Sequence, residues 1–297
     1  MHHSVRRLIA GQFSKRILAM MLLLPLPGIA MADMAQIVER GRMHVATEDM
    51  FPPFNFITNG QPDGFQKDLL VDFRAFAKEK AGIEVEQEVL PWTGLLAAIS
   101  AGRYDLGWTG TAVTEERVST AFNFSPPFLA LRTHLLVRKD DDSMKDISSL
   151  SGKVFAVQTG GAELAWLPEL EAAIKETGGT FNEVVQYPSP AEASTDLANG
   201  RIDAVITANI TAIQIASANP DKFVLGIPVM KPNFVAWPVP KASPELLKFV
   251  TEFMDHIRAN GRLAELQDKW FGLEMGELPT EPITSPEALR AMIDKFD

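Results

Sequence analysis

Cysteine is absent from the 297 residues of this chain. The absence excludes disulfides, a thiol nucleophile, thiolate metal ligands and a lipid anchor carried on cysteine. Histidine is scarce, and no two of the five histidines stand at the spacing of metal ligands. The phosphate-binding loop, the dinucleotide-binding glycine pattern and the serine nucleophile turn are missing as well. We therefore expect no metal, no cofactor and no catalytic residue.

Positive charge is in short supply, since 28 Lys and Arg face 38 Asp and Glu and the formal net charge is -10. Proteins that bind nucleic acid neutralise its phosphates with clustered Lys and Arg. After the first 32 residues, this chain has no basic stretch of that kind. Nucleic acid is therefore excluded as a partner.

The N-terminal segment has the order of a secretory signal peptide. Basic pairs at positions 6–7 and 15–16 precede the apolar run 17–24, and small residues lead to Ala32. The run is shorter than the roughly 20 residues that a bilayer-spanning helix needs. We predict that residues 1–32 are removed and that the mature protein lies in the periplasm.

The remaining chain alternates short β-branched or aromatic runs with amphipathic stretches. Residues 43–46 indicate a strand, and apolar residues between Phe65 and Ala77 recur at helical spacing up to Gly82. In residues 83–89, apolar side chains alternate with glutamates, which indicates a half-buried strand. This alternation predicts an α/β protein with mostly parallel strands.

One sequence pattern occurs twice. Residues 95–114 and 194–212 each contain a helical stretch, a capping glycine, Arg-x-Asp and a strand that ends in small and hydroxyl residues. Gly102 and Gly200 are too far apart for a solenoid repeat, so the spacing favours two similar lobes. Chance recurrence of a common helix-glycine-strand junction is the open alternative.

Two proline-punctuated extended stretches, in residues 124–128 and 223–240, flank the second copy of the pattern. They suggest that one lobe is inserted into the other, with a hinge of two crossings near residues 125–131 and 227–237. The last helices then return to the first lobe. The predicted organisation is a signal peptide (1–32), lobe 1 (33–128), lobe 2 (129–230), the return to lobe 1 (231–272) and a weakly helical C-terminal tail (273–297) without assigned function.

Eight motifs in order resemble the polar amino-acid-binding periplasmic receptors, the third family of extracellular solute-binding proteins. The motifs lie at residues 42–56, 64–69, 101–106, 114–117, 124–128, 150–154, 200–204 and 260–272. The resemblance implies a type II periplasmic-binding-protein fold, in which each lobe is a mostly parallel sheet flanked by helices. It also implies a monomer that binds a small polar carboxylate or zwitterion and delivers it to the membrane permease subunits of an ABC importer.

The resemblance places a ligand between the lobes. Phe51 and Trp92 correspond to its aromatic walls, the segment Thr109, Gly110, Thr111 to the cleft floor, and Arg117 to the carboxylate clamp. A guanidinium bonds both oxygens of a carboxylate at once, and a helix that begins at Thr114 adds a favourable dipole for an anion. The alternative for Arg117 is an ion pair with Glu115 or Glu116.

The turn Gly160, Gly161, Ala162, Glu163 precedes a predicted helix in lobe 2. Glycines at a helix start allow backbone N–H groups to approach an anion, so we expect these residues to complete the carboxylate site. The alternative is a simple tight turn, with Glu163 placed to suit the helix dipole. Relatives in the family usually carry hydroxyl residues here.

The expected partner for a ligand ammonium is missing, because Ala208 stands where amino-acid-binding members usually have aspartate. Glu48 or Asn209 are candidates to replace it. A ligand with a delocalised or alkylated nitrogen, such as an ectoine-like compatible solute, would instead use the cation–π surface of Phe51 and Trp92. Trp108 is a third aromatic candidate, for which we favour core packing.

Two other functions stay open at this stage. Periplasmic cyclohexadienyl dehydratases resemble the same family, and Glu48 or Glu163, if buried, would have the raised pKa that a general acid needs. The other is a sensor that signals only by docking. We nevertheless predict a receptor and not an enzyme.

Overall fold

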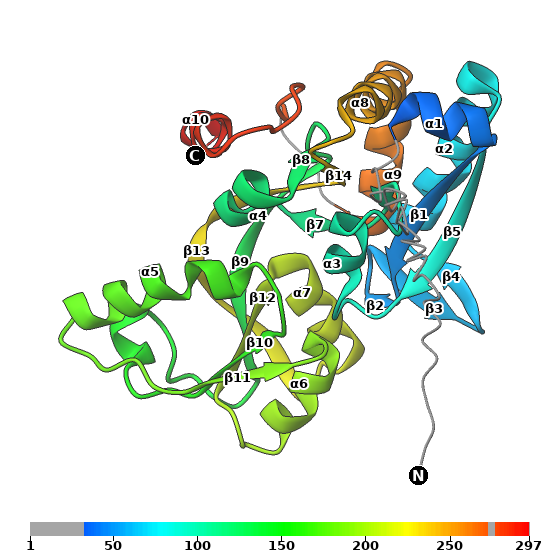
Figure 1. Ribbon diagram of the computed structural model, residues 1–297. Helices are drawn as coiled ribbons and strands as arrows, with labels where there is room; N and C mark the ends of the chain where they lie inside the picture. Colours follow the sequence, from blue (N-terminus) through cyan, green and yellow to red (C-terminus); the bar gives the residue numbers. More distant parts are fainter. Residues whose placement is uncertain (1–32, 273–276, 297) are drawn as a thin grey trace, which may run out of the picture. The chain divides into compact units, whose positions relative to one another are not determined.

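The computed structural model describes residues 33–272 and 277–296 (Figure 1). The predicted signal peptide, residues 1–32, lies outside the described residues. In the described ranges, no helix has the length and apolar character needed to cross a bilayer. The described elements form two α/β lobes, each built around its own sheet.

The sheet of lobe 1 has three parallel strands in the order β5-β1-β6, and Val45 on the central strand pairs with Leu106. Helix α2 covers it with its predicted apolar stripe, and Gly82 ends that helix with a left-handed φ of 69°. A three-stranded antiparallel sheet follows β1. The elements are α1 (Met34–Arg40), β1 (Arg42–Glu48), β2 (Met50–Phe51), β3 (Asn55–Thr58), β4 (Gln61–Asp63), α2 (Phe65–Ala81), β5 (Glu84–Leu90), α3 (Leu95–Ser100) and β6 (Leu106–Gly107).

An aromatic core joins this sheet to the returning helices α8 (Pro244–Ala259) and α9 (Arg262–Phe271). Trp108 lies at its centre, stacked on Trp237 at 4.2 Å between ring centroids and on Phe73 at 4.6 Å. Its indole N–H donates to the Gln66 carbonyl at 2.7 Å. Trp108 is fully buried, so the preference for core packing is confirmed.

The sheet of lobe 2 has six strands in the order β11-β10-β12-β9-β13-β7. The pairs β10/β11 and β10/β12 are parallel, whereas β12/β9, β9/β13 and β13/β7 are antiparallel. The expectation of mostly parallel strands therefore fails for the part of this sheet that contains the two crossing strands, which run in opposite directions. The elements are β7 (Thr111–Ala112), β9 (Leu129–Arg138), η1 (Ile147–Leu150), β10 (Phe155–Gln158), α5 (Glu163–Glu176), β11 (Val184–Tyr187), α6 (Pro190–Ala198), β12 (Ala204–Ala208), α7 (Asn209–Ala218) and β13 (Phe223–Ala236).

Strands β9 and β13 lie side by side along both predicted crossings. Their register shifts around Pro228 and Pro232, because proline lacks the N–H that a continuous ladder requires. The Trp237 N–H donates to Ser125 Oγ at 3.0 Å, which ties the two crossings together. The residue bounds of the lobes and the hinge motion stay predictions.

The repeated Gly-Arg-x-Asp pattern has the same local structure in both lobes. Gly102 and Gly200 both have left-handed φ values, of 74° and 69°. Asp105 accepts the His44 N–H at 2.7 Å, and Asp203 accepts the Val154 N–H at 2.8 Å. Each aspartate therefore ties its own strand to the neighbouring one, so the repeat serves the same structural purpose twice.

The C-terminal tail packs on lobe 1 more closely than its sequence indicates. Ile283 is fully buried and forms an antiparallel bridge with Phe124. Helix α10 (Pro286–Phe296) then lies against α4 (Glu115–Thr120), and Leu289 is buried between them. The short strands β8 (Phe122–Phe124) and β14 (Pro238–Pro240) complete this part of the lobe.

Candidate ligand-binding cleft

A small cavity of about 40 Å³ lies where the end of β1 faces the start of α5. Its walls come from both lobes, and its volume is well below the roughly 300–1,000 Å³ typical of small-molecule sites. Eight of the twelve predicted binding residues line it. The complete lining is Glu48, Phe51, Trp92, Gly110, Ala112, Arg117, Gln158, Gly161, Ala162, Glu163 and Thr207.

Arg117 reaches this cavity from the first turn of α4, which Thr114 caps by accepting the Arg117 N–H at 3.2 Å. The guanidinium donates to the Ala112 carbonyl at 2.8 Å and to the Gly160 carbonyl at 2.9 Å. These bonds use two of its five N–H donors and link the lobes. Burial lowers the Arg117 pKa to about 10, so the group stays cationic at neutral pH.

The alternative of an ion pair between Arg117 and Glu115 is wrong. Glu115 is bound by Arg290 of α10, whose Nη1 lies 3.2 Å and 3.0 Å from its two carboxylate oxygens. Glu116 forms no ion pair with Arg117 among the described residues, although its charge favours the cation. The guanidinium is thus held by neutral carbonyls and retains its full charge for a ligand.

Glu48 occupies the carboxyl end of β1, where parallel strands present their functional groups. Its side chain is 3 % exposed, and Oε1 accepts a bond of 3.2 Å from Gln158 Nε2 of lobe 2. Burial raises the Glu48 pKa to about 8, against the opposing effect of the Gln158 hydrogen bond. Glu48 is therefore mostly protonated at neutral pH in this arrangement.

Glu163 begins α5 and turns its carboxylate back over the helix start, where it accepts its own backbone N–H. A Cβ on Gly161 would lie 2.6 Å from Glu163 Oε2 and 2.9 Å from the Gln158 carbonyl oxygen, so a larger residue would displace the carboxylate and press on the backbone. The Gly161 N–H donates to the Gln158 carbonyl at 2.9 Å. The tight-turn alternative therefore holds for Gly161, because its N–H already has a partner.

Aromatic rings close two sides of the cavity. Trp92 lies under the guanidinium of Arg117, whose Cζ is 5.4 Å from the ring centroid. Phe51 stacks on Phe54 at 4.9 Å between centroids. Gly110 permits this packing, because a Cβ there would approach the Phe54 ring to 2.7 Å.

A family model agrees with this geometry. The model named "Bacterial extracellular solute-binding proteins, family 3" matches residues 43–273. The chain belongs to this family. The match ends before α10, so the C-terminal helix of this family 3 protein lies outside the matched region.

Three similar proteins illustrate the relationship. The L-cystine-binding protein TcyJ of Escherichia coli (strain K12) is 25% identical over 81% of this chain and 86% of its own length. An ancestral arginine-binding protein, solved with arginine, is 30% identical over 78% of this chain and 99% of its own, with a TM-score of 0.66. The ancestral amino acid-binding protein AncCDT-1, described as a precursor of cyclohexadienyl dehydratase, is 27% identical over 80% and 98%, with a TM-score of 0.67. The type II periplasmic-binding-protein fold is thereby confirmed.

Four predicted residues of this family 3 protein do not line the cavity. Thr109 is fully buried behind it, and its hydroxyl donates to Asn55 Oδ1 at 3.2 Å. Thr111 is fully buried, and Gly160 contributes its carbonyl to Arg117. Asn209 begins α7, and its Oδ1 is buried without a hydrogen-bond partner among the described residues.

The residue of β12 that faces the cavity also differs from the one expected. Thr207 lines the cavity, whereas Ala208 packs against the aromatic core of lobe 1. Successive residues of a strand face opposite sides, so the two cannot share one role. Gln158 was missed as well, although it ends β10 in the way that Glu48 ends β1. Gln158 and Glu48 each stand at the carboxyl end of a strand, and this position is the signal that identifies them.

Proposed function

We propose that this family 3 protein is the periplasmic substrate-binding component of an ABC importer for a polar amino acid or a related small zwitterion. The observation that carries the proposal is one half-buried guanidinium, Arg117, in the same two-lobed cavity as the carboxyl groups of Glu48 and Glu163. The named similar proteins bind cystine or arginine, which are amino acids of this kind. Family membership supports a receptor that closes on its ligand and not an enzyme.

In the proposed complex, Arg117 binds the ligand carboxylate through the donors that its two carbonyl bonds leave over. Gly161 allows close approach beside it, while Trp92 supports the guanidinium from below. Phe51 covers the ligand on the lobe 1 side. Thr207 supplies a hydroxyl from lobe 2, in the place first assigned to Asn209.

Glu48 serves as the partner of the ligand ammonium, the role that an aspartate at position 208, here Ala208, was expected to fill. It is buried, it lies across the cavity from lobe 2, and Gln158 orients its carboxyl group. A cationic ligand group beside Glu48 would lower its pKa from about 8 and expel its proton. A basic amino acid would therefore release a proton on binding, whereas a ligand that leaves Glu48 protonated would not.

Calorimetric titration with L-arginine, L-glutamine, L-cystine, ectoine and succinate tests this function. The same titrations in two buffers of different ionisation enthalpy report the protons released. Arg117→Ala should weaken binding of a carboxylate ligand by about a hundredfold or more, because the ligand charge loses its buried partner. Arg201→Ala, at an exposed arginine on the surface of lobe 2, is the matched control and should have no effect. Unchanged affinity in Arg117→Ala would remove this residue from the site.

A second candidate, a cyclohexadienyl dehydratase, is supported by one observation. The protonated Glu48 carboxyl group is a proton donor at neutral pH, as required to expel the hydroxyl group of prephenate as water while carbon dioxide leaves. Similarity to AncCDT-1 also supports it. Incubation with prephenate, with detection of phenylpyruvate, separates the candidates: turnover that is lost in Glu48→Gln would establish the enzyme, and no turnover leaves the receptor.

A further inference from the structure

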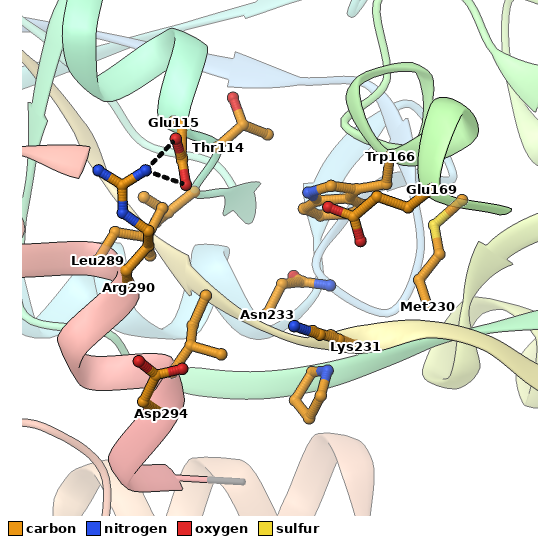
Figure 2. Close-up of a pocket in the computed structure, with 13 residues that line it drawn as sticks. Thr114, Glu115, Trp166, Glu169, Met230, Lys231, Asn233, Leu289, Arg290 and Asp294 are labelled. Carbon is orange, nitrogen blue, oxygen red and sulfur yellow. Dashed lines mark hydrogen bonds and ion pairs between the residues drawn. The ribbon is translucent and has the colours of Figure 1, made fainter. Parts of the chain in front are cut away.

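A second cavity lies between α5 and α10, over the crossing strand β13 (Figure 2). It measures about 270 Å³ and shares no lining residue with the cleft. Lobe 2 contributes α5 and lobe 1 contributes α4 and α10. We call this cavity the α5–α10 groove.

The groove has a mixed lining, with apolar side chains on two of its walls. Trp166 of α5 is half-buried, and its indole faces the groove in Figure 2. Leu289 and Ile293 of α10 form the opposite wall, with Leu289 2 % exposed. An indole face beside aliphatic side chains favours a ligand with an apolar surface.

The charged rim of the groove is acidic on balance. Glu115 and Arg290 neutralise each other at 3.0 Å. Glu169 and Asp294 form no ion pair with any residue in the described ranges, and neither does Lys231. Two unpaired carboxylates thus face one ammonium group. Figure 2 shows Glu169 beside Trp166, on the same side of the groove.

We propose that the α5–α10 groove binds an organic cation with an apolar body, such as a quaternary ammonium compound. The cation would lie against the face of Trp166, as cations do on aromatic rings, with Glu169 and Asp294 balancing its charge. Lys231 opposes this binding from β13. The groove is open to solvent, so the expected affinity is in the millimolar range.

The position of the groove gives this site a further property. Its walls belong to different lobes, and Asp294 lies in α10, outside the family match. An occupant that contacts both walls would stabilise the closed arrangement, and the cleft ligand would do the same. This coupling between the groove and the cleft rests on the proposed function, whereas binding of a cation in the groove does not.

Choline, compared with its uncharged isostere dimethylbutanol, tests the proposal by saturation-transfer NMR on the intact mature chain. Choline should bind and the isostere should bind more weakly. Trp166→Leu and Glu169→Gln should each weaken the binding of choline about three- to fivefold. Lys231→Gln should strengthen it about twofold, because an opposing charge is removed. Glu171→Gln, on the same helix but paired with Lys175, should change nothing.

Three outcomes would overturn the proposal. One is no choline binding at all, and another is equal binding of the uncharged isostere. The third is binding that survives Trp166→Leu but disappears in Trp92→Leu, which places choline in the cleft. Glu169 is exposed, so its glutamine variant keeps the test valid even if Trp166→Leu unfolds.

Discussion

Replacing Glu48 with glutamine should stabilise the protein at alkaline pH. In the folded protein Glu48 keeps its proton up to about pH 8, whereas an unfolded glutamate loses it near 4.5. Between these values the folded state holds the extra proton, so the free energy of unfolding falls as the pH rises. Glutamine is neutral throughout and its carbonyl still accepts the bond from Gln158. The variant therefore does not lose this part of the free energy of unfolding as the pH rises.

The magnitude follows from the size of the pKa change. At about 1.4 kcal/mol for each pKa unit, the rise from 4.5 to about 8 corresponds to about 5 kcal/mol. This is an upper bound, because separation of the lobes would admit water to the carboxylate at lower cost. We expect the variant and the natural protein to differ little near pH 4.5 and by about 2–5 kcal/mol at pH 8.5.

Urea denaturation at half-unit intervals between pH 4.5 and 8.5 measures the effect in both proteins. The difference between the two curves isolates Glu48, since every other ionisable group is the same in both proteins. Glu252→Gln, at an exposed glutamate on α8, is the control and should follow the natural protein. A constant difference across this range would refute the assignment of Glu48 as a buried carboxyl group. A glutamine variant less stable than the natural protein at pH 8.5 would refute it as well.

Two further substitutions test neighbouring parts of the structure. Gly161→Ala places a Cβ 2.6 Å from Glu163 Oε2 and 2.9 Å from the Gln158 carbonyl oxygen, so it should weaken binding of the cleft ligand about tenfold and also lower the thermal midpoint. Unaltered affinity would place the carboxylate elsewhere. Ile283→Ala removes a fully buried side chain and should cost about 2–4 kcal/mol in urea denaturation, more than Ile293→Ala on the partly exposed face of α10. Equal losses would show that the tail is not anchored at Phe124.

Local patterns were sufficient wherever the determining residues are close in the chain. The apolar stripe of α2 and its end at Gly82 arise from spacing within one helix. The capping of α4 by Thr114, which accepts the Arg117 N–H, arises within four consecutive positions. The repeated Gly-Arg-x-Asp pattern likewise predicted two similar lobes, because each copy sets one helix-strand junction and one aspartate bond.

Cleft residues were predictable as a set but not in detail. Eight of the twelve lie on the cavity, because motif order assigns each to a strand end or helix start. Thr207 lines the cavity in place of the expected position 208 because of the face that β12 turns to the cavity. That face is set by the pairing of β12 with β9. Strand pairing across a long sequence separation leaves no mark in the local pattern.

The sequence by itself determined the α/β class, the two lobes and the helix start that presents Arg117, because short-range periodicity and capping govern all three. Only the tertiary structure decided that Gln158 meets Glu48 across the cleft, that Arg290 takes Glu115 away from Arg117, and that the tail packs as α10. Each of these contacts joins residues far apart in the chain. Their pKa values, charges and burial depend on neighbours that only folding brings together.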